Sequence, residues 1–134
     1  MQQHPEYVAE NNAMRYLSDN NGEKYNLCHF WSNFEIADMD FWRSEVYQKF
    51  FEFLDSKGGF YYERWGDAPV HSLAVSLFAD KDRLHFFDDI GYRHPPFEHC
   101  PTGQMRSGRN CDCRPAQSID RFPQSCLPRY NNLW

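Results

Sequence analysis

The chain has 134 residues, of which 41% are hydrophobic and 18% aromatic, and its formal net charge is -5. This size fits one domain, and the hydrophobic and aromatic content excludes a chain that is disordered throughout. The acidic balance excludes the basic surface that binding to nucleic acid phosphates requires.

The sequence shows neither the pattern of a membrane span nor that of a secretory signal. No run approaches a length of about 18 consecutive apolar residues, which a membrane span requires. Residues 1–10 also lack the charged and then apolar order of a secretory signal. The sequence as given therefore predicts no targeting segment.

The cysteines nevertheless indicate an oxidising compartment. Four of the five follow residue 99, in a segment rich in Pro and polar residues. Cys111 and Cys113 are too close in sequence to bridge each other easily, so we expect each to pair with a distant partner. The odd total leaves one cysteine as a free thiol or with a partner outside this sequence.

Helices and strands are expected to alternate. The sequence predicts helices over residues 5–17, 38–54 and 69–78. It predicts strands over residues 25–31, 60–65 and 84–87. Asp38 or Asp40 can cap the second helix, Lys57-Gly58-Gly59 closes it, and Asp67 can cap the third. The alternation favours an α/β layered fold, followed from residue 95 by an irregular, covalently tethered tail.

Glu35 is the first candidate for chemistry. It follows the strand predicted over residues 25–31, where aromatic neighbours could desolvate it and a loop could aim it into a cleft. A carboxylate so placed can act as a nucleophile or charge stabiliser at the anomeric carbon of a sugar. The alternative is a surface glutamate near a helix start, stabilised by the helix dipole.

Three further residues carry two interpretations each. His94 follows the strand predicted over residues 84–87 and is either a metal-binding or phosphate-facing group or a solvated loop histidine. Asp67 is either a helix cap or a contact to a hydroxyl-rich ligand. Trp31 is either a core residue or a platform for a pyranose ring. His71, inside the third helix, is expected to be packed and hydrogen-bonded.

A zinc site that combines Cys111-Asp112-Cys113 with His94, His99 and Cys100 is a weaker possibility. Structural zinc sites use pairs of cysteines two to four residues apart, and no second such pair is present in the sequence.

Four ordered blocks of the sequence form a specific pattern. The blocks are YNLCHFWSNFEI at 25–36, GGFYYERWGDAPVHS at 58–72, HFFDDIGYRHPP at 85–96, and NCDC at 110–113 with Ser125-Cys126. Together they resemble the fungal α-1,2-mannosyltransferases of glycosyltransferase family 15. The resemblance implies a partial catalytic domain over 1–134, with core motifs in 24–96 and a Cys/Pro-rich tail in 97–134. It also implies a GT-A type α/β fold, of which this is the C-terminal portion.

The resemblance assigns roles to the candidates. It implies transfer of mannose from GDP-mannose to mannosyl acceptors with retention of configuration, in protein glycosylation and cell-wall mannan synthesis. Glu35 falls on the family's proposed nucleophile and His94 on its manganese-binding histidine. Trp31 and Asp67 fall at positions associated with the acceptor sugar.

The same resemblance implies parts that this sequence does not contain. A carboxylate ligand for the manganese and most of the guanine-binding surface would lie upstream of residue 25. We expect a parent enzyme in the Golgi lumen, a single-pass type II protein held in the membrane by an N-terminal anchor. Two alternatives are a noncatalytic, disulfide-stapled module that binds mannan through Trp31 and Asp67, and a cytosolic zinc module.

Overall fold

The computed structural model describes residues 4–103 and 111–134, which divide into two compact units. Unit 1 comprises residues 4–84 together with Leu133 and Trp134, and unit 2 comprises residues 85–132. Each unit has its own set of helices or strands and its own internal contacts. No helix in the described part of the chain is long and apolar enough to cross a membrane.

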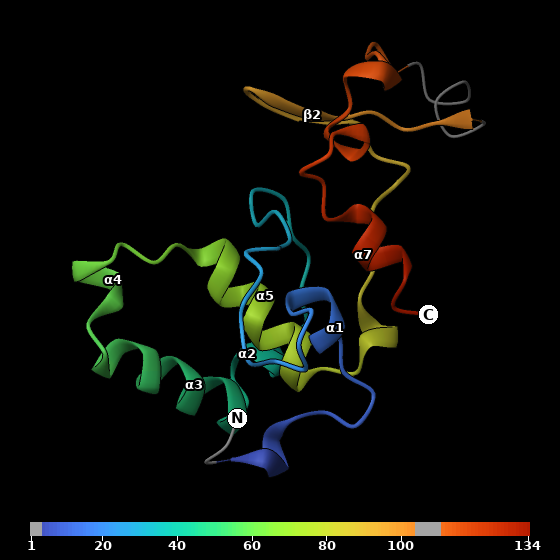
Figure 1. Cartoon of the computed structure of the whole chain (residues 1–134). Helices are drawn as coiled ribbons and strands as arrows, with labels where there is room; N and C mark the ends of the chain where they lie inside the picture. Colours follow the sequence, from blue (N-terminus) through green and yellow to red (C-terminus); the bar gives the residue numbers. More distant parts are fainter. Residues whose placement is uncertain (1–3, 104–110) are drawn as a thin grey trace. The chain divides into compact units, whose positions relative to one another are not determined.

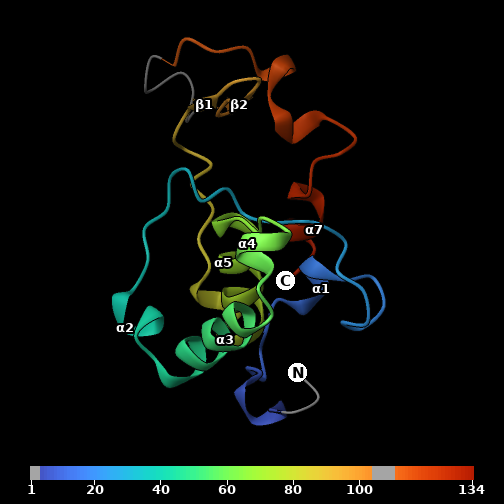
Figure 2. The ribbon, with the colours of Figure 1, turned by 90° about the vertical axis from the view of Figure 1, so that its left-hand side faces the viewer.

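Unit 1 is built around helix α5 (Asp67–Phe78). Its buried side carries Val70, Ala74 and Leu77, and α1 (Met14–Leu17) packs against it with Tyr16 and Leu17 buried. The ribbon shows the two helices beside each other (Figure 1, Figure 2). The core of unit 1 is therefore helical.

The segment leading into α1 is fixed to α5 through backbone hydrogen bonds. The Ala9 and Ala13 amides donate to the carbonyls of Leu77 and Ser76 at 2.8 and 2.7 Å. A short 3-10 turn, η1 (Pro5–Tyr7), precedes this segment, so the helix predicted over 5–17 forms only at its two ends. Between η1 and α1, the amides of Ala9 and Ala13 bond to carbonyls of α5 instead of forming the regular i to i+4 bonds of a helix.

The helix predicted over residues 38–54 is two helices, α2 (Met39–Trp42) and α3 (Glu45–Ser56). Asp38 caps the first through the Asp40 amide, as predicted, and Ser44 caps the second through the Tyr47 amide. Because Ser44 takes an extended backbone with ψ 150°, it interrupts the helix and starts a new one. The predicted closure at Lys57-Gly58 is confirmed, with Gly58 in the left-handed region at φ +69°.

The strand predicted over residues 60–65 is wrong. Residues 60–62 belong to a short helix, α4 (Gly59–Tyr62), for which Gly58 is the N-cap. The Tyr62 and Glu63 amides donate to the carbonyls of Gly58 and Gly59. A Cβ at Gly59 would lie 2.4 Å from the Trp65 ring, so a glycine is required there. Figure 1 shows α4 in the connection between α3 and α5. The aromatic run favours a strand, but the described residues place no neighbouring strand there to pair with it.

The strands predicted over 25–31 and 84–87 are also wrong. Leu27 has a φ of +70°, which breaks the extended alternation, and the Phe30 amide donates to the Ser72 side chain instead of a neighbouring strand. Residues 84–87 follow the 3-10 turn η2 (Lys81–Arg83) without entering a ladder. The described residues thus contain none of the three strands that suggested a layered sheet.

Unit 2 contains the sheet that the described residues do form, a two-stranded antiparallel hairpin. Strands β1 (Tyr92–His94) and β2 (Phe97–His99) are joined by Pro95-Pro96, and His94 pairs with Phe97. Beyond the hairpin, the described residues of the unit form the short helical turns η3 (Pro115–Gln117), η4 (Ile119–Arg121) and α7 (Leu127–Asn131). Part of the predicted tail therefore has regular structure.

A disulfide joins Cys100, at the end of β2, to Cys113. Cys111 carries a free thiol, so the expectation of a distant partner is confirmed for Cys113 and wrong for Cys111. Cys100 is fully buried, as are its neighbours in space Pro101 and Ser118. The disulfide is thus the centre of a small core rather than a surface staple.

Large aromatic side chains lie exposed on α3 and α4. Phe53 exposes 50% of its surface, and Tyr61 and Tyr62 expose 77% and 85%. Leu27 and Ile36, in the irregular segments, each expose 74%. Unit 1 therefore presents several large apolar side chains to solvent.

Candidate active site

Glu35 lies opposite helix α5 and contacts one of its side chains. Both carboxylate oxygens of Glu35 are 3.1 Å from Nδ1 of His71. The side chains of His71 and Glu35 are 30% and 36% exposed, so neither is sealed from solvent. The prediction that His71 is packed and hydrogen-bonded is confirmed.

A second carboxylate, that of Asp67 on α5, is hydrogen-bonded to the segment that contains Glu35. Ser32 Oγ donates a short hydrogen bond to Oδ2 of Asp67, the first residue of α5. Together with the bond from the Phe30 amide to Ser72 Oγ at 2.7 Å, this attaches residues 30–35 along α5. The segment predicted as a strand is therefore held by helix side chains.

Asp67 is held in its charged form. The hydrogen bond from Ser32 lowers the pKa of Asp67, and backbone N–H groups at the helix start together with the nearby His71 act in the same direction. Gly66 occupies the N-cap position, so Asp67 contributes from the first turn instead of from the cap itself. An ionised, exposed carboxylate is available there to accept a hydrogen bond from a ligand hydroxyl.

Aromatic rings surround the imidazole of His71. The Trp42 ring lies 4.5 Å from it between centroids, at an angle of 34°, and Tyr47 approaches edge-on at 6.4 Å. Burial raises the pKa of Tyr47, and the charge of Glu35 raises it further. Glu35, His71 and Tyr47 are therefore electrostatic neighbours within unit 1.

Trp31 lies in the same attached segment and is half-buried. Its neighbours in sequence, Phe30 and Ser32, make the contacts to α5 described above. The Phe30 ring stacks on buried Tyr16 at 4.5 Å, which fixes the segment just before Trp31. Three predicted residues, Trp31, Glu35 and Asp67, thus belong to one junction between the segment 30–35 and α5.

His94 belongs to unit 2, where it ends strand β1 and is exposed. Among residues 4–103 and 111–134, no three His, Cys, Asp or Glu side chains gather as a metal ion requires. His94 therefore belongs to no such cluster within the described residues.

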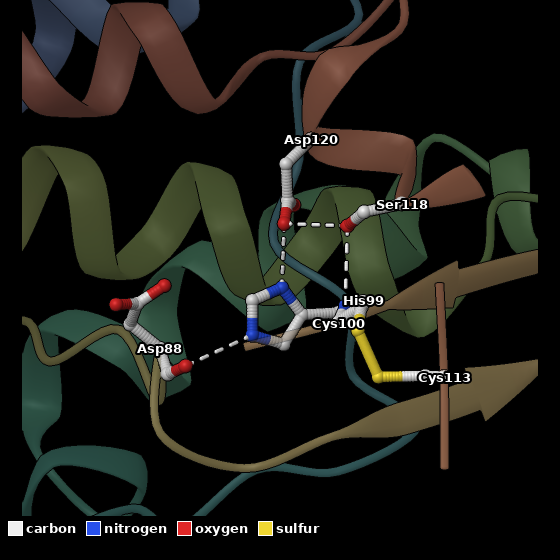
Figure 3. Close-up of a disulfide and its surroundings, with 6 residues drawn as sticks. All are labelled: Asp88, His99, Cys100, Cys113, Ser118 and Asp120. Carbon is white, nitrogen blue, oxygen red and sulfur yellow. Dashed lines mark hydrogen bonds and ion pairs between the residues drawn. A yellow bond between two sulfur atoms is a disulfide. The ribbon is translucent and has the colours of Figure 1, made fainter. Parts of the chain in front are cut away.

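A second histidine–carboxylate pair lies inside unit 2. Nδ1 of His99 is 2.6 Å from Oδ2 of Asp120, and Nε2 faces the carbonyl oxygen of Asp88 at 3.3 Å. Ser118 Oγ donates to the same Asp120 oxygen at 2.7 Å and accepts from the Cys100 amide at 3.1 Å (Figure 3). The network thus connects strand β2, turn η4 and the disulfide.

The charges of this second pair support each other. The hydrogen bond that His99 donates to Asp120 raises the pKa of His99, against the opposing effect of burial. Burial works against the charge of Asp120 too, but hydrogen bonds from His99 and Ser118 outweigh it and lower the pKa of Asp120. Because Ser118 and His99 both bond to the carboxylate and not to each other, the three do not form a nucleophilic triad.

A family model described as glycolipid 2-alpha-mannosyltransferase matches residues 1–133. The chain belongs to glycosyltransferase family 15. The resemblance found in the four sequence blocks is thereby confirmed.

Curated family 15 proteins are close in sequence to the chain. An "O-glycoside alpha-1,2-mannosyltransferase homolog 2" of Schizosaccharomyces pombe is 56% identical over 133 residues, covering 99% of this chain and 34% of that protein. The chain spans about a third of the length of the curated relatives it matches.

Solved family 15 structures share the fold. The mannosyltransferase Ktr4p of Saccharomyces cerevisiae, in complex with GDP, matches with a TM-score of 0.80 at 47% identity. The match covers 99% of this chain and 36% of that one. Core-mannan synthase A of Aspergillus fumigatus, in an Mn/GDP form, matches with a TM-score of 0.77 at 42% identity, over 96% of this chain and 35% of that one. The chain therefore has the fold of the corresponding part of a glycosyltransferase.

Sequence reasoning missed two features of this family 15 chain. It did not connect His71 with Glu35, although Asp67 and His71 are four residues apart on a predicted helix and so share a face. It also gave no role to Ser32 or Asp120, and it considered His99 only as part of a zinc site. The partners of these three residues lie 21 to 35 residues away, at distances that no local pattern reveals.

Proposed function

We propose that the chain forms part of a retaining α-1,2-mannosyltransferase that transfers mannose from GDP-mannose to mannosyl acceptors. The observation that carries the proposal is the half-exposed Glu35 carboxylate bonded to His71, with ionised Asp67 on the same helix. The α-1,2-mannosyltransferase name of the S. pombe relative and the GDP in the Ktr4p complex support the substrate class.

Each residue of the junction has a chemical role in this proposal. Glu35 offers its carboxylate to the anomeric carbon, either by bonding to it or by stabilising the positive charge that develops there. Asp67, kept ionised by Ser32, accepts a hydrogen bond from a hydroxyl of the acceptor sugar. Trp31 presents an aromatic face to the apolar side of a pyranose.

A divalent metal is part of the proposal. The Mn/GDP form of the A. fumigatus structure supports manganese, with His94 supplying one imidazole ligand. When bound, manganese would neutralise charge on the departing diphosphate. We further propose the GT-A type of glycosyltransferase fold and residence of the whole enzyme in the Golgi lumen, behind an N-terminal membrane anchor.

The test is transfer of mannose from GDP-mannose to methyl α-mannoside by the purified chain with manganese. We expect Glu35→Gln to reduce the rate about 1,000-fold or more, since the carboxylate contributes to the transition state itself. Glu52→Gln, an exposed carboxylate on α3, is the matched control and should leave the rate unchanged.

One result would contradict the proposal: full activity in Glu35→Gln would remove Glu35 from the reaction. No transfer by a wild-type chain with a folded circular dichroism spectrum would mean that these 134 residues are not an enzyme by themselves, and it would leave a glycan-binding module as the alternative. Binding of methyl α-mannoside without GDP-mannose or manganese would then identify such a module.

A further inference from the structure

We infer that His71 is a positioning residue, which orients the Glu35 carboxylate for its role at the anomeric carbon. The inference rests on the proposed function, because it gives His71 its role through Glu35. It assigns His71 no contact with the sugar itself.

The geometry of the contact identifies the donor. One ring nitrogen, Nδ1, lies 3.1 Å from both oxygens of Glu35. An ionised carboxylate only accepts hydrogen bonds, so the proton of this bond belongs to Nδ1. A single N–H shared between two oxygens fixes the plane of the carboxylate and leaves further lone pairs on each oxygen. Glu35 is thus oriented and still able to react.

Glu35 needs such a partner because its own segment is irregular. Residues 33–37 belong to no helix or strand, and the next residue, Ile36, leaves 74% of its surface exposed. Burial of this neighbour therefore does little to fix the backbone at Glu35. The bond from His71 connects this position to a helix of twelve residues.

His71 itself is well fixed. It lies between Val70 and Ser72, which are 5% and 1% exposed, in the middle of α5. The Trp42 ring packs on its imidazole at 4.5 Å between centroids, and the Tyr47 edge limits movement from another direction at 6.4 Å. Rotation of the imidazole would lose the aromatic packing, so its N–H direction is set before any substrate binds.

The charges around His71 reinforce this role. Glu35 bonds to it directly, and Asp67 is one helical turn earlier, near enough for His71 to contribute to lowering the pKa of Asp67. Tyr47, on α3, is a further titratable group that faces the pair. His71 is thus the common neighbour of the two carboxylates to which the proposed function assigns roles.

The test compares two substitutions that differ in one property. His71→Phe keeps an aromatic ring against Trp42 but removes the donor, whereas His71→Asn keeps an N–H close to the place of Nδ1. A hydrogen bond to a charged group is worth enough to lower kcat about tenfold to a hundredfold. We expect that loss in His71→Phe with little change in KM, and recovery of most of the rate in His71→Asn. His85→Phe, an exposed histidine of unit 2, serves as control.

Each kinetic outcome decides a different point. An unchanged kcat in folded His71→Phe overturns the positioning role. An equal loss in His71→Phe and His71→Asn also overturns it, because loss of the donor would not explain the effect. An unaffected Glu35→Gln variant, by contrast, contradicts the proposed role of Glu35.

A second measurement decides the matter should the wild-type chain show no transfer. Nitrogen-15 NMR of the histidines reports which ring nitrogen of His71 carries the proton. A protonated Nδ1 whose signal changes in Glu35→Ala and not in Glu52→Ala supports the assignment. An Nδ1 that carries no proton, or a signal that is the same in Glu35→Ala as in the wild type, overturns the positioning role of His71 independently of activity.

Discussion

The two units each contain a histidine bonded to a carboxylate, but in different surroundings. In unit 1 the His71 and Glu35 side chains are 30% and 36% exposed, and the bond is 3.1 Å long. In unit 2 the His99 and Asp120 side chains are 9% and 21% exposed, and the bond is 2.6 Å long. The same two chemical groups therefore serve different purposes, and burial distinguishes them.

The partners of each pair explain the difference. Asp120 also accepts from Ser118, which in turn accepts from the amide of disulfide-bonded Cys100. All of that network lies within the framework of unit 2. Glu35, by contrast, has an accessible carboxylate in an irregular segment. The buried pair holds a fold together, and the exposed pair is available to a ligand.

The largest effect is expected from removing the disulfide next to the buried pair. Cys100→Ser should destabilise unit 2 by about 3 kcal/mol, because the bridge closes a loop with a sequence separation of 13. Urea unfolding, followed by the NMR signals of residues 92–99, measures the change. Cys111→Ser removes only the free thiol and should change the free energy of unfolding by less than about 0.5 kcal/mol.

Breaking the buried pair itself should cost slightly less. Asp120→Ala leaves Nδ1 of His99 and Oγ of Ser118 without their common acceptor, which should destabilise unit 2 by about 2 to 3 kcal/mol. The same urea experiment applies. Asp112→Ala, an exposed carboxylate beside Cys113, is the control, and an equal loss there would show that burial is not the distinguishing factor.

The buried pair should also make unit 2 sensitive to pH. The pKa of His99 is raised above its ordinary 6.5, so its stabilisation is complete below about pH 6.5 and is lost as the pH rises through the higher folded value. The pKa of Asp120 is lowered below its ordinary 3.8, so its share is present above that pH and is lost only as the pH falls through the lower folded value.

Unit 2 should therefore be most stable between about pH 4 and 6.5 and should weaken as the pH rises above this range. Free energies of unfolding measured across and above this range test the expectation. His99→Gln should flatten the decline above pH 6.5, and His85→Gln should retain it. A decline that persists in His99→Gln would assign the pH dependence to another group.

The smallest effect on stability is expected at the exposed pair. Glu35→Ala should change the free energy of unfolding of unit 1 by less than about 1 kcal/mol, since solvent screens a pair that is about one-third exposed. Urea unfolding followed by the NMR signals of α5 measures it. A loss as large as that from Asp120→Ala would make the exposed pair structural too.

Helices with local signals were predictable from the sequence. Asp38 as a cap, the closure at Lys57-Gly58 and the end of α5 at Phe78 all depend on residues within a few positions of the helix they affect. The break at Ser44 was missed because the apolar pattern continues across it. The cap signal of a serine before glutamate was available there.

The predicted strands failed for a physical reason. Aromatic runs such as residues 60–65 suit a strand only where a partner strand is present, and the described chain provides none for them. The site was predicted in part. Four blocks identified the family and its candidates, but the bonds from Ser32 to Asp67 and from His71 to Glu35 join positions 35 and 36 residues apart.

The exposed rings of α3 and α4 determine how the purified chain will behave at high concentration. Tyr61 and Tyr62 keep 77% and 85% of their surface in water, so replacing both with serine removes little packing from the fold. Such a variant should remain dispersed at concentrations where the parent scatters light, without a lower melting temperature. Solubility and thermal stability can then be adjusted independently in this chain.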